Sequence, residues 1–417
     1  MTNPSLLAQL GALQGLMRDL VETASDDSQV VPGLGTLGWY LGRSVYRELY
    51  WLREVVGGDA DLSGRVRHIF ATASSPVEGA TGRNEPEADP GALSTLLPPR
   101  QHLLRWAQEI QDEDLRHLAT PGALPAHPLL AEDRLPWYLL QEAAKDFERM
   151  LSVRLLRRLG QPDSDDYRVG TPLTSQPPVR DADLVAVTQG HYRIGSRQEP
   201  FAYDNELPPQ AVELSSYRIA RTPVTNAQFL GFMEAGGYSA SVLWDQEGLA
   251  WLAANSVRAP LHWRQDPLGR WYGVGVAGPA DLPGDQPVSG VNRHEARAYA
   301  NWAATLGGIG AGAVLQHEYQ WEVAARSGVI DGLGSVWEWC ANPLHPYPDF
   351  VPFPDSASAQ AFASGQASLR GASLHTQRCL RRASLRHWAG PAERHGFAGI
   401  RLVFPSADGE RPEDPGP

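Results

Sequence analysis

The sequence predicts an α+β protein built from a four-helix bundle followed by a loop-rich domain. Through the first 160 residues, apolar side chains recur at three- and four-residue steps, which is the pattern of amphipathic helices. From residue 184 onward, short β-type runs are separated by turns, and most of the glycine, proline and tryptophan lies there. At 417 residues the chain is also too long for one compact core.

Composition limits the classes of function. The formal net charge of −12 argues against non-specific nucleic-acid binding, which needs a basic surface. No apolar run approaches the roughly 20 residues that span a bilayer, so we expect no membrane partner. Residues 1–4 do not begin a basic and then apolar leader, and Cys340 and Cys379 are the only cysteines. These features predict a cytoplasmic protein without a secretory signal.

Four helices are expected in the bundle, residues 1–160. The second should cover residues 37–56, the third should lie within 93–118, and the fourth should cover 137–159. The polar segment 74–90 is expected to be a long mobile loop. The first helix is indicated by one apolar stripe: Leu6, Leu7, Leu10, Leu13, Met17 and Leu20.

Residues 161–183 lack periodicity and are expected to be a linker. The second domain should cover residues 184–405, with strands at 184–187 and 211–214. Helices are expected at 226–235 and 292–306, with Asn226 and Asn292 as N-caps. The acidic, proline-rich tail, 406–417, is expected to be disordered.

Separated sequence blocks in the second half, in a fixed order, resemble the formylglycine-generating-enzyme-type domain, also called the sulfatase-modifying-factor domain. That resemblance covers about residues 185–404 and implies a fold related to C-type lectins, with little regular structure. The blocks include Thr222-Pro-Val-Thr-Asn226, Gly236-Gly-Tyr238, Pro287-Val-Ser-Gly-Val-Asn292, Val336-Trp-Glu-Trp339, Leu369-Arg-Gly-Ala-Ser373 and Gly399-Ile-Arg-Leu402.

The whole chain is similar to a narrower group, the two-domain non-haem iron enzymes typified by ergothioneine sulfoxide synthase and selenoneine synthase. In that group a DinB-like four-helix bundle precedes the formylglycine-type domain. The resemblance implies Fe(II) and O₂ as cofactor and oxidant, and a histidine betaine with a thiol or selenol donor as ligands. It rests on Leu37-Gly-Trp-Tyr-Leu-Gly42, Tyr50-Trp-Leu-Arg53, Phe201-Ala-Tyr-Asp-Asn-Glu206 and Pro346-Tyr-Pro-Asp-Phe350.

The same resemblance implies three histidine ligands, one on the second helix and two in an H-x3-H-x-E run on the fourth. In this chain the corresponding positions hold Arg43, Glu142 and Asp146, and Glu148 matches the trailing acid. A guanidinium has no lone pair for a metal. We therefore expect no iron bound in the usual way and an ion pair from Arg43 to Glu142 or Asp146. A different register or another ligand set is the alternative.

Other residues are candidates for the substrate cleft. His375, His387 and His395 cluster in sequence near it, and Tyr347 and Trp388 are expected to line a pocket for a trimethylammonium group. Trp337 and Trp339 are expected to be core residues, and Arg370 and Arg401 to brace loops by bonding backbone carbonyls. Two alternatives stay open for the three histidines, which are either solvated or hydrogen-bonding side chains or ligands of an irregular metal site.

Copper-dependent formylglycine generation is disfavoured, since the resemblance implies two cysteines five positions apart, and Ser384 stands where a partner of Cys379 would be. Two hypotheses remain. The protein is an enzyme that joins sulfur or selenium to a histidine betaine, or it is a binding or regulatory pseudoenzyme that keeps the two-domain fold. A fold does not guarantee its usual chemistry.

Overall fold

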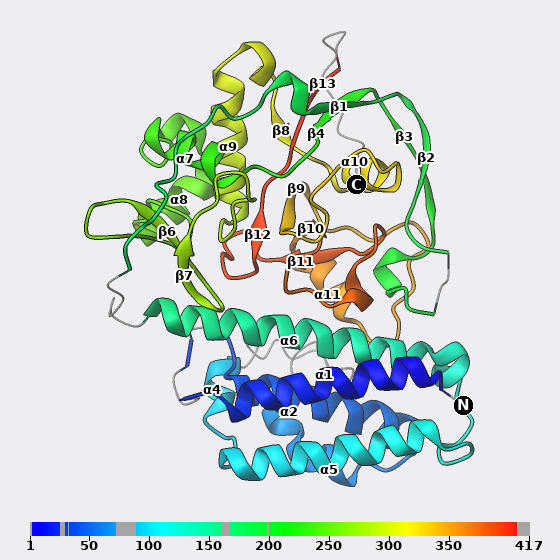
Figure 1. Ribbon diagram of the computed structural model, residues 1–417. Helices are drawn as coiled ribbons and strands as arrows, with labels where there is room; N and C mark the ends of the chain where they lie inside the picture. The colour runs from blue at the N-terminus through cyan, green and yellow to red at the C-terminus, as the bar shows by residue number, and fades with distance from the viewer. Residues whose placement is uncertain are drawn as a thin grey trace.

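The computed structural model describes residues 2–25, 30–31, 33–71, 89–160, 167–197 and 200–406. The expected mobile loop falls mostly outside these residues, as does nearly all of the expected disordered tail. A layer of helices forms one end of the molecule and a mixed helical and sheet part forms the other, with helix α6 lying where the two meet (Figure 1). One buried hydrophobic cluster contains side chains from both parts.

Four long helices make the bundle: α1 (Pro4–Glu22), α2 (Leu37–Glu48), α5 (Arg100–Ala119) and α6 (Arg134–Gly160). Helix α1 packs on α5 and α6, and α2 packs on the same two helices. The apolar stripe of α1 is buried at Leu6, Leu10, Leu13 and Met17, as its spacing predicted. The four predicted helices are therefore confirmed.

Two features of the bundle differ from the expectation. The second helix does not stay α-helical to Val56, because residues Leu49–Val56 form a π-helix. The described residues also include the shorter helices α3 (Asp61–Phe70) and α4 (Pro90–Ser94). Helix α3 escaped prediction because its apolar residues are few and Gly64 interrupts it.

The C-terminal part, in the residues that the structure describes, is built from four small sheets. The expected strands at 184–187 and 211–214 are confirmed as β1 and most of β3. The first sheet has the order β1-β4-β13-β8 and the second β11-β10-β9-β12, in which only the β9–β12 pair is parallel. The strands of these two sheets are β1 (Leu184–Val187), β4 (Tyr217–Ala220), β8 (Val314–Leu315), β9 (Trp337–Pro343), β10 (Ala367–Gly371), β11 (His387–Ala389), β12 (Ala398–Gly399) and β13 (Leu402–Pro405).

The remaining elements surround these sheets. The other strands are β2 (Gly190–Ile194) with β3 (Gln210–Leu214), and β5 (Trp263–Gln265), β6 (Trp271–Gly275) and β7 (Gly278–Asp281). The helices are α7 (Asn226–Glu234), α8 (Gln246–Asn255), α9 (Arg293–Thr305), α10 (Glu318–Arg326) and α11 (Ala357–Ala363).

Caps explain where two of these helices begin. Asn292 caps α9, and its carboxamide accepts from the backbone N–H of Glu295 while Glu295 bonds back, so this N-cap is confirmed. The N-cap of α7 is Thr225 rather than Asn226, so that prediction is wrong. Asn226 is the first helical residue, and its amide instead donates to the carbonyl of Pro283.

Buried arginines brace the loops of the C-terminal part. Arg401 pairs with Glu338 and donates to the carbonyls of Ala220, Arg221 and Asp331. Arg370 pairs with Glu322 and donates to two carbonyls of the 383–384 segment. The expected role of Arg370 and Arg401 is confirmed. Such bonds replace the regular ladders that a loop-rich domain lacks.

Helix α6 joins the two parts through polar contacts. The carboxylate of Glu148 accepts from the Trp337 indole at 2.9 Å, from Ser373 at 2.5 Å and from Thr376 at 2.8 Å. Near the start of α6, the amide of Gln141 donates to the carbonyl of Phe201 at 3.0 Å. The Glu148 contacts hold α6 against strand β9 and the segment after β10, and the Gln141 contact reaches the segment before residue 204. Among the described residues, no helix has the length and apolarity to cross a bilayer.

Candidate functional site

A buried group of charges joins α2 to the middle of α6. Arg43 of α2 forms an ion pair with Asp146 of α6, and Arg47, one turn further along α2, approaches the second oxygen of Asp146 at 2.8 Å. The expected ion pair between Arg43 and Asp146 is therefore present. The guanidinium of Arg43 also lies over the rings of Trp39 and Tyr40, at 4.8 and 5.0 Å from their centroids.

Glu142 has other partners than Arg43. Its carboxylate lies 3.4 Å from the Arg47 guanidinium and 2.9 Å from the Lys145 ammonium, and it accepts from the Tyr203 hydroxyl at 2.9 Å. Asp146 is thus paired with two cations of α2, whereas Glu142 is paired with one cation of α2 and one of α6 itself. Tyr203 contributes a further donor from the C-terminal part.

The surroundings keep both carboxylates ionised. Burial alone would raise the pKa of Asp146, but the charges of Arg43 and Arg47 outweigh it and hold the pKa below its usual value. Burial likewise opposes ionisation of Glu142, and Lys145 with Arg47 brings its pKa below the usual range. Near neutral pH, two anions and their neighbouring cations therefore coexist in this cluster.

These residues do not fit an iron ion. Arg43 offers no lone pair, and the carboxylates of Glu142 and Asp146 already accept from cationic donors. The described part of the chain also brings no three His, Cys, Asp or Glu side chains together in a group that could hold a metal. The chemistry of this cluster is therefore that of ion pairs and hydrogen bonds.

A cavity that is partly open to solvent lies beside this cluster. One wall is a single face of α6, because Lys145, Glu148, Arg149 and Ser152 follow at three- and four-residue steps. The opposite walls come from the β11-β10-β9-β12 sheet and the segment before β12. The other lining residues are Trp337, Trp339, Leu369, Leu380, Leu385, His387, Trp388, Ala389, Glu393, His395, Gly396 and Ala398.

Aromatic side chains dominate the sheet wall. The His387 ring packs against Trp337 with centroids 4.6 Å apart and lies 6.1 Å from Trp388. The Lys145 ammonium lies 5.3 Å from the Trp388 centroid and 3.8 Å from that of Tyr203. Indole faces attract cations and bury large apolar bodies, so this wall suits a planar or cationic group.

Two of the three predicted histidines border the cavity. Burial lowers the pKa of His387 to about 3, with Lys145 and Arg149 acting in the same direction. Burial also lowers the pKa of His395, whose imidazole lies 3.3 Å from the Glu393 carboxylate. Neutral imidazoles at these positions can donate or accept one hydrogen bond each at neutral pH.

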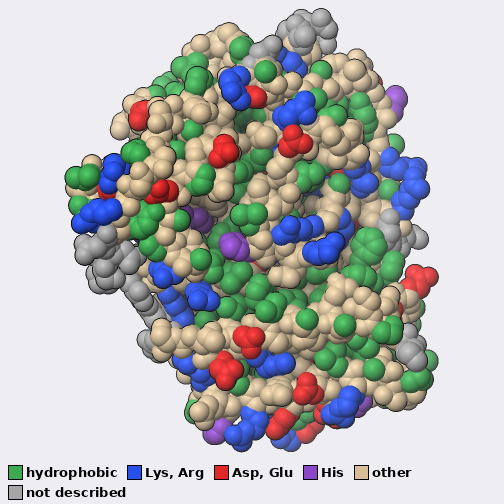
Figure 2. Space-filling model, viewed as in Figure 1, with side chains coloured by type: hydrophobic (Ala, Val, Ile, Leu, Met, Phe, Trp, Pro, Cys, Tyr) green, Lys and Arg blue, Asp and Glu red, His purple; other side chains and the backbone are tan. Residues whose placement is uncertain are grey.

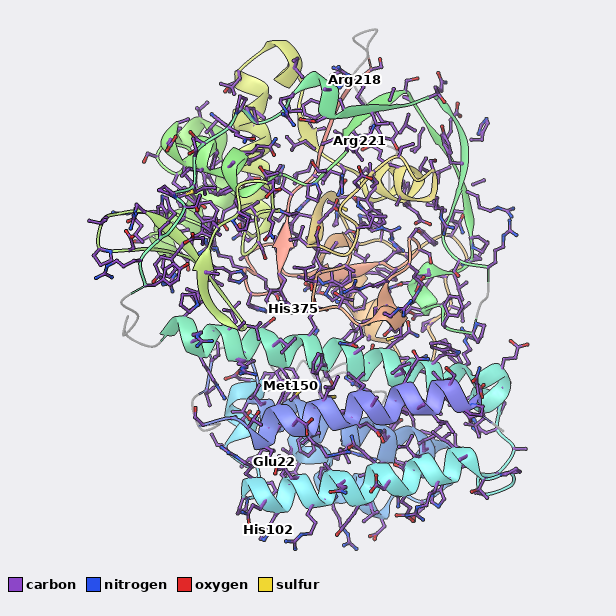
Figure 3. The ribbon with its side chains drawn as sticks, in the orientation of Figure 1. Glu22, His102, Met150, Arg218, Arg221 and His375 are labelled. Atoms are coloured by element: carbon purple, nitrogen blue, oxygen red, sulfur yellow. The ribbon has the colours of Figure 1, made fainter. Side chains whose placement is uncertain are left out.

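His375 lies in a different place. It lines an open groove that also contains His262 and Arg154, and its ring packs on Phe397 with the ring centroids 4.5 Å apart. In Figure 3 His375 lies next to α6, on the side of the C-terminal part. The structure therefore separates His375 from the cavity that His387 and His395 border.

The aromatic residues are distributed differently from the expectation. Tyr347 is only 2% exposed, and its ring contacts Tyr319 and the Arg386 guanidinium, so it does not line the cavity. Trp388 lines the cavity and lies on strand β11. Trp337 and Trp339 are buried, as expected of core residues, yet both also border the cavity.

Three charged cavity residues were missed by sequence reasoning: Glu393, Lys145 and Arg149. The spacing of Lys145 and Arg149 from Glu148 and Ser152 places these four on one helix face, which the sequence could have indicated. Which face meets the sheet becomes clear only when the bundle and the sheet are packed together.

Comparison with known proteins identifies the family of the C-terminal part. Residues 171–330 and 327–405 match the Sulfatase-modifying factor enzyme 1-like domain, and together they make up more than half of the chain. The chain therefore belongs to the family that carries this domain. The hercynine oxygenase of Mycolicibacterium smegmatis is 30% identical over 308 residues, which cover 62% of this chain and 68% of that protein. The chain is thus related to the hercynine oxygenases within the family.

Other relatives match over shorter stretches. The hercynine oxygenase of Mycolicibacterium thermoresistibile is 31% identical over 255 residues. The match covers 49% of this chain and 54% of that protein, so the chain spans about half the length of this relative. The formylglycine-generating enzyme of Thermomonospora curvata is 32% identical over 161 residues, covering 35% of this chain and 49% of that protein. The solved structure of PvdO from Pseudomonas aeruginosa has 18% identity and a TM-score of 0.37, covering 56% of this chain and 99% of that one, and this likeness supports no conclusion.

Proposed function

We propose that this protein binds a small histidine-derived betaine in the α6 cavity and lacks the Fe(II)- and O₂-dependent reaction implied by the family resemblance. The observation that carries the proposal is the pairing of Asp146 with Arg43 and Arg47. A carboxylate that is already paired with two guanidinium groups is not available to bind a metal ion. The fold and the cavity are kept, while the expected ligand positions hold an internal charge cluster.

Energetics favour the charge cluster over an ion. Arginine stays protonated at any ordinary pH, so a metal at this place would lie beside positive charge. Breaking a buried ion pair by removing one partner costs about 3–5 kcal/mol, because the other charge is left uncompensated. Metal binding by Asp146 would incur a similar penalty at Arg43.

The cavity wall supports a betaine as the ligand. Trp337 and Trp388 present indole rings, and a trimethylammonium group is attracted to such faces when it is removed from water. Neutral His387 can donate a hydrogen bond to a ligand imidazole or accept one from it. The name of these relatives, hercynine oxygenase, points to the same class of small molecule.

A second candidate function is oxidative formation of a carbon–sulfur or carbon–selenium bond with another set of iron ligands. It is favoured by the 30% identity that extends over 68% of the M. smegmatis hercynine oxygenase. The two candidates differ in one measurable respect, since the second requires iron and consumes oxygen.

The test compares ligand binding with oxygen consumption. Titration of the purified chain with histidine betaine should quench or enhance tryptophan fluorescence, because the cavity contains three indoles. Oxygen uptake should stay at the blank level when Fe(II), the betaine and a thiol or selenol donor are added together. The M. smegmatis hercynine oxygenase is the positive control. Substrate-dependent uptake by this chain would establish the second candidate and refute the first.

A further inference from the structure

Arg149 is a charged side chain that has no bonded partner among the described residues. It lies on α6 one turn after Lys145, is exposed, and lines the cavity. Within the described ranges, no hydrogen bond or ion pair joins its guanidinium to another side chain or to a carbonyl. By contrast, Arg43, Arg47 and Arg370 all have such bonds.

The nearby acids are already engaged. Glu142 and Asp146 pair with Arg43, Arg47 and Lys145. The carboxylate of Glu148 accepts from three neutral groups, those of Trp337, Ser373 and Thr376. Glu393 accepts from the Gly390 backbone at 2.7 Å and lies against His395.

Arg149 differs from the other charged groups near the cavity because it has no bonded partner. Four cations, Arg43, Arg47, Lys145 and Arg149, lie near four carboxylates, those of Glu142, Asp146, Glu148 and Glu393. Within the described ranges, each of these groups except Arg149 takes part in a hydrogen bond or an ion pair. His387 and His395 border the same space and are neutral near pH 7. A cation without a bonded partner beside aromatic walls attracts anions more strongly than one in open water, because the walls exclude part of the water that would screen it.

We propose that the cavity recognises its ligand through a carboxylate, which accepts paired hydrogen bonds from the Arg149 guanidinium while the planar body of the ligand lies against Trp337 and Trp388. The inference rests on the proposed function, in that the cavity holds a small molecule. The planar fork of arginine matches a carboxylate in geometry, and a bidentate pair is among the stronger hydrogen-bonded contacts. The ligand class is therefore a small organic carboxylate with a flat ring.

The experiment compares carboxylates with their carboxamides. The probes are histidine betaine, imidazole-4-acetate and indole-3-acetate, each titrated beside the matching amide and followed by calorimetry or tryptophan fluorescence. The wild-type chain should bind at least one carboxylate about tenfold or more tightly than its amide. Absence of any carboxylate binding at millimolar concentration would overturn the inference.

Variants identify the residue responsible. Arg149→Gln should weaken carboxylate binding about tenfold or more and leave amide binding unchanged, and Arg149→Lys should recover part of the loss. Arg154→Gln is the matched control, because Arg154 is an exposed arginine of the same helix that lines the other groove. A purely structural Arg149 would instead weaken acid and amide equally and lower the melting temperature, and that result would refute the inference.

Failure of this inference is distinguishable from failure of the proposed function. Substrate-dependent oxygen uptake would refute the absence of iron chemistry, whatever the carboxylate titrations show. Equal affinity for acid and amide, with no oxygen uptake, would refute the role of Arg149 and leave a binding protein of another selectivity.

Discussion

The buried arginines of the C-terminal part and those around α6 follow different patterns. In the C-terminal part, Arg401 and Arg370 each pair with a buried glutamate and donate their other N–H groups to carbonyls. Around α6, Arg43, Arg47 and Lys145 are paired with carboxylates, but Arg149 has no bonded partner in the part of the chain that the structure describes. Fully bonded charges indicate a structural role, whereas a cation without a bonded partner at a cavity indicates a place for a ligand.

Hydrophobic side chains gather along the boundary between the bundle and the C-terminal part on the face shown in Figure 2. The contacts of Glu148 cross this boundary and fix α6 against the sheet. The cavity thus has a rigid floor of helix and a rigid aromatic wall, which favours a preorganised site.

The largest predicted effect comes from removing Arg401, whose bonds brace the loops of the C-terminal part. Arg401→Met should lower the free energy of unfolding by about 3–5 kcal/mol, because Glu338 loses its charge partner and three carbonyls lose their donor. Urea denaturation followed by tryptophan fluorescence measures this. The control is Arg221→Met, since Arg221 is exposed and lies 4.0 Å from the exposed Asp331, far from α6 in Figure 3. Equal effects of the two variants would contradict the structural role of Arg401.

A smaller and asymmetric effect is expected around α6. Asp146→Asn should destabilise the chain by about 3 kcal/mol, because it leaves Arg43 and Arg47 without their shared anion. Arg47→Gln should cost about 1 kcal/mol or less, since Asp146 keeps Arg43 and Glu142 keeps Lys145. Thermal and urea unfolding of the two variants measures the difference. If removing Arg47 costs as much as removing the acid, Arg43 alone does not compensate the charge of Asp146, and the shared pairing is contradicted.

The response to pH should differ between the two regions. The folded-state pKa of His387 is lowered to about 3, so the folded chain resists protonation that the unfolded chain accepts. Its contribution to stability is complete above the ordinary histidine pKa of about 6.5 and is lost as the pH falls toward 3. At pH 5 the loss should be about 2 kcal/mol, and urea denaturation at several pH values should show that His387→Gln removes this dependence.

In the bundle, Glu48 should make stability depend on pH in the opposite direction. Burial, with the nearby Asp114, raises the pKa of Glu48 to about 8, so the folded chain holds a proton that the unfolded chain releases. This contribution is complete below the ordinary glutamate pKa of about 4.5 and is lost as the pH rises through 8. Glu48→Gln should remove the fall in stability between about pH 4.5 and 8 and leave the profile below pH 4.5 unchanged, as urea denaturation at several pH values would show. A change confined to pH values below 4.5 would assign the titration to another group.

The sequence predicted the parts that depend on local pattern. The stripe of Leu6, Leu10, Leu13 and Met17 predicts α1, and Asn292 as an N-cap predicts the start of α9. The opposite charges at positions 43 and 146 predict their pairing once the two helices are aligned. These features follow from periodicity and from the chemistry of neighbouring turns.

Other features depend on packing, which the sequence alone does not reveal. The residue type of an aromatic side chain does not show which surface it meets. Tyr347 does not line the cavity, because its ring contacts Arg386. Trp337 is a core residue that also borders the cavity. The role of Arg149 depends on which face of α6 meets the sheet. The π-helical end of the second helix depends on how residues Leu49–Val56 pack, which residue type alone does not determine.

Iron content distinguishes a charge cluster from a metal site between α2 and α6. The chain and its variant with Arg43→His, Glu142→His and Asp146→His are loaded anaerobically with Fe(II), desalted and analysed for iron, with circular dichroism to check folding. We expect negligible iron in the wild-type chain and close to one ion per chain in the variant, where three imidazoles replace the charge cluster. Stoichiometric iron in the wild-type chain would show that the ion pairs of Arg43 and Asp146 do not exclude a metal.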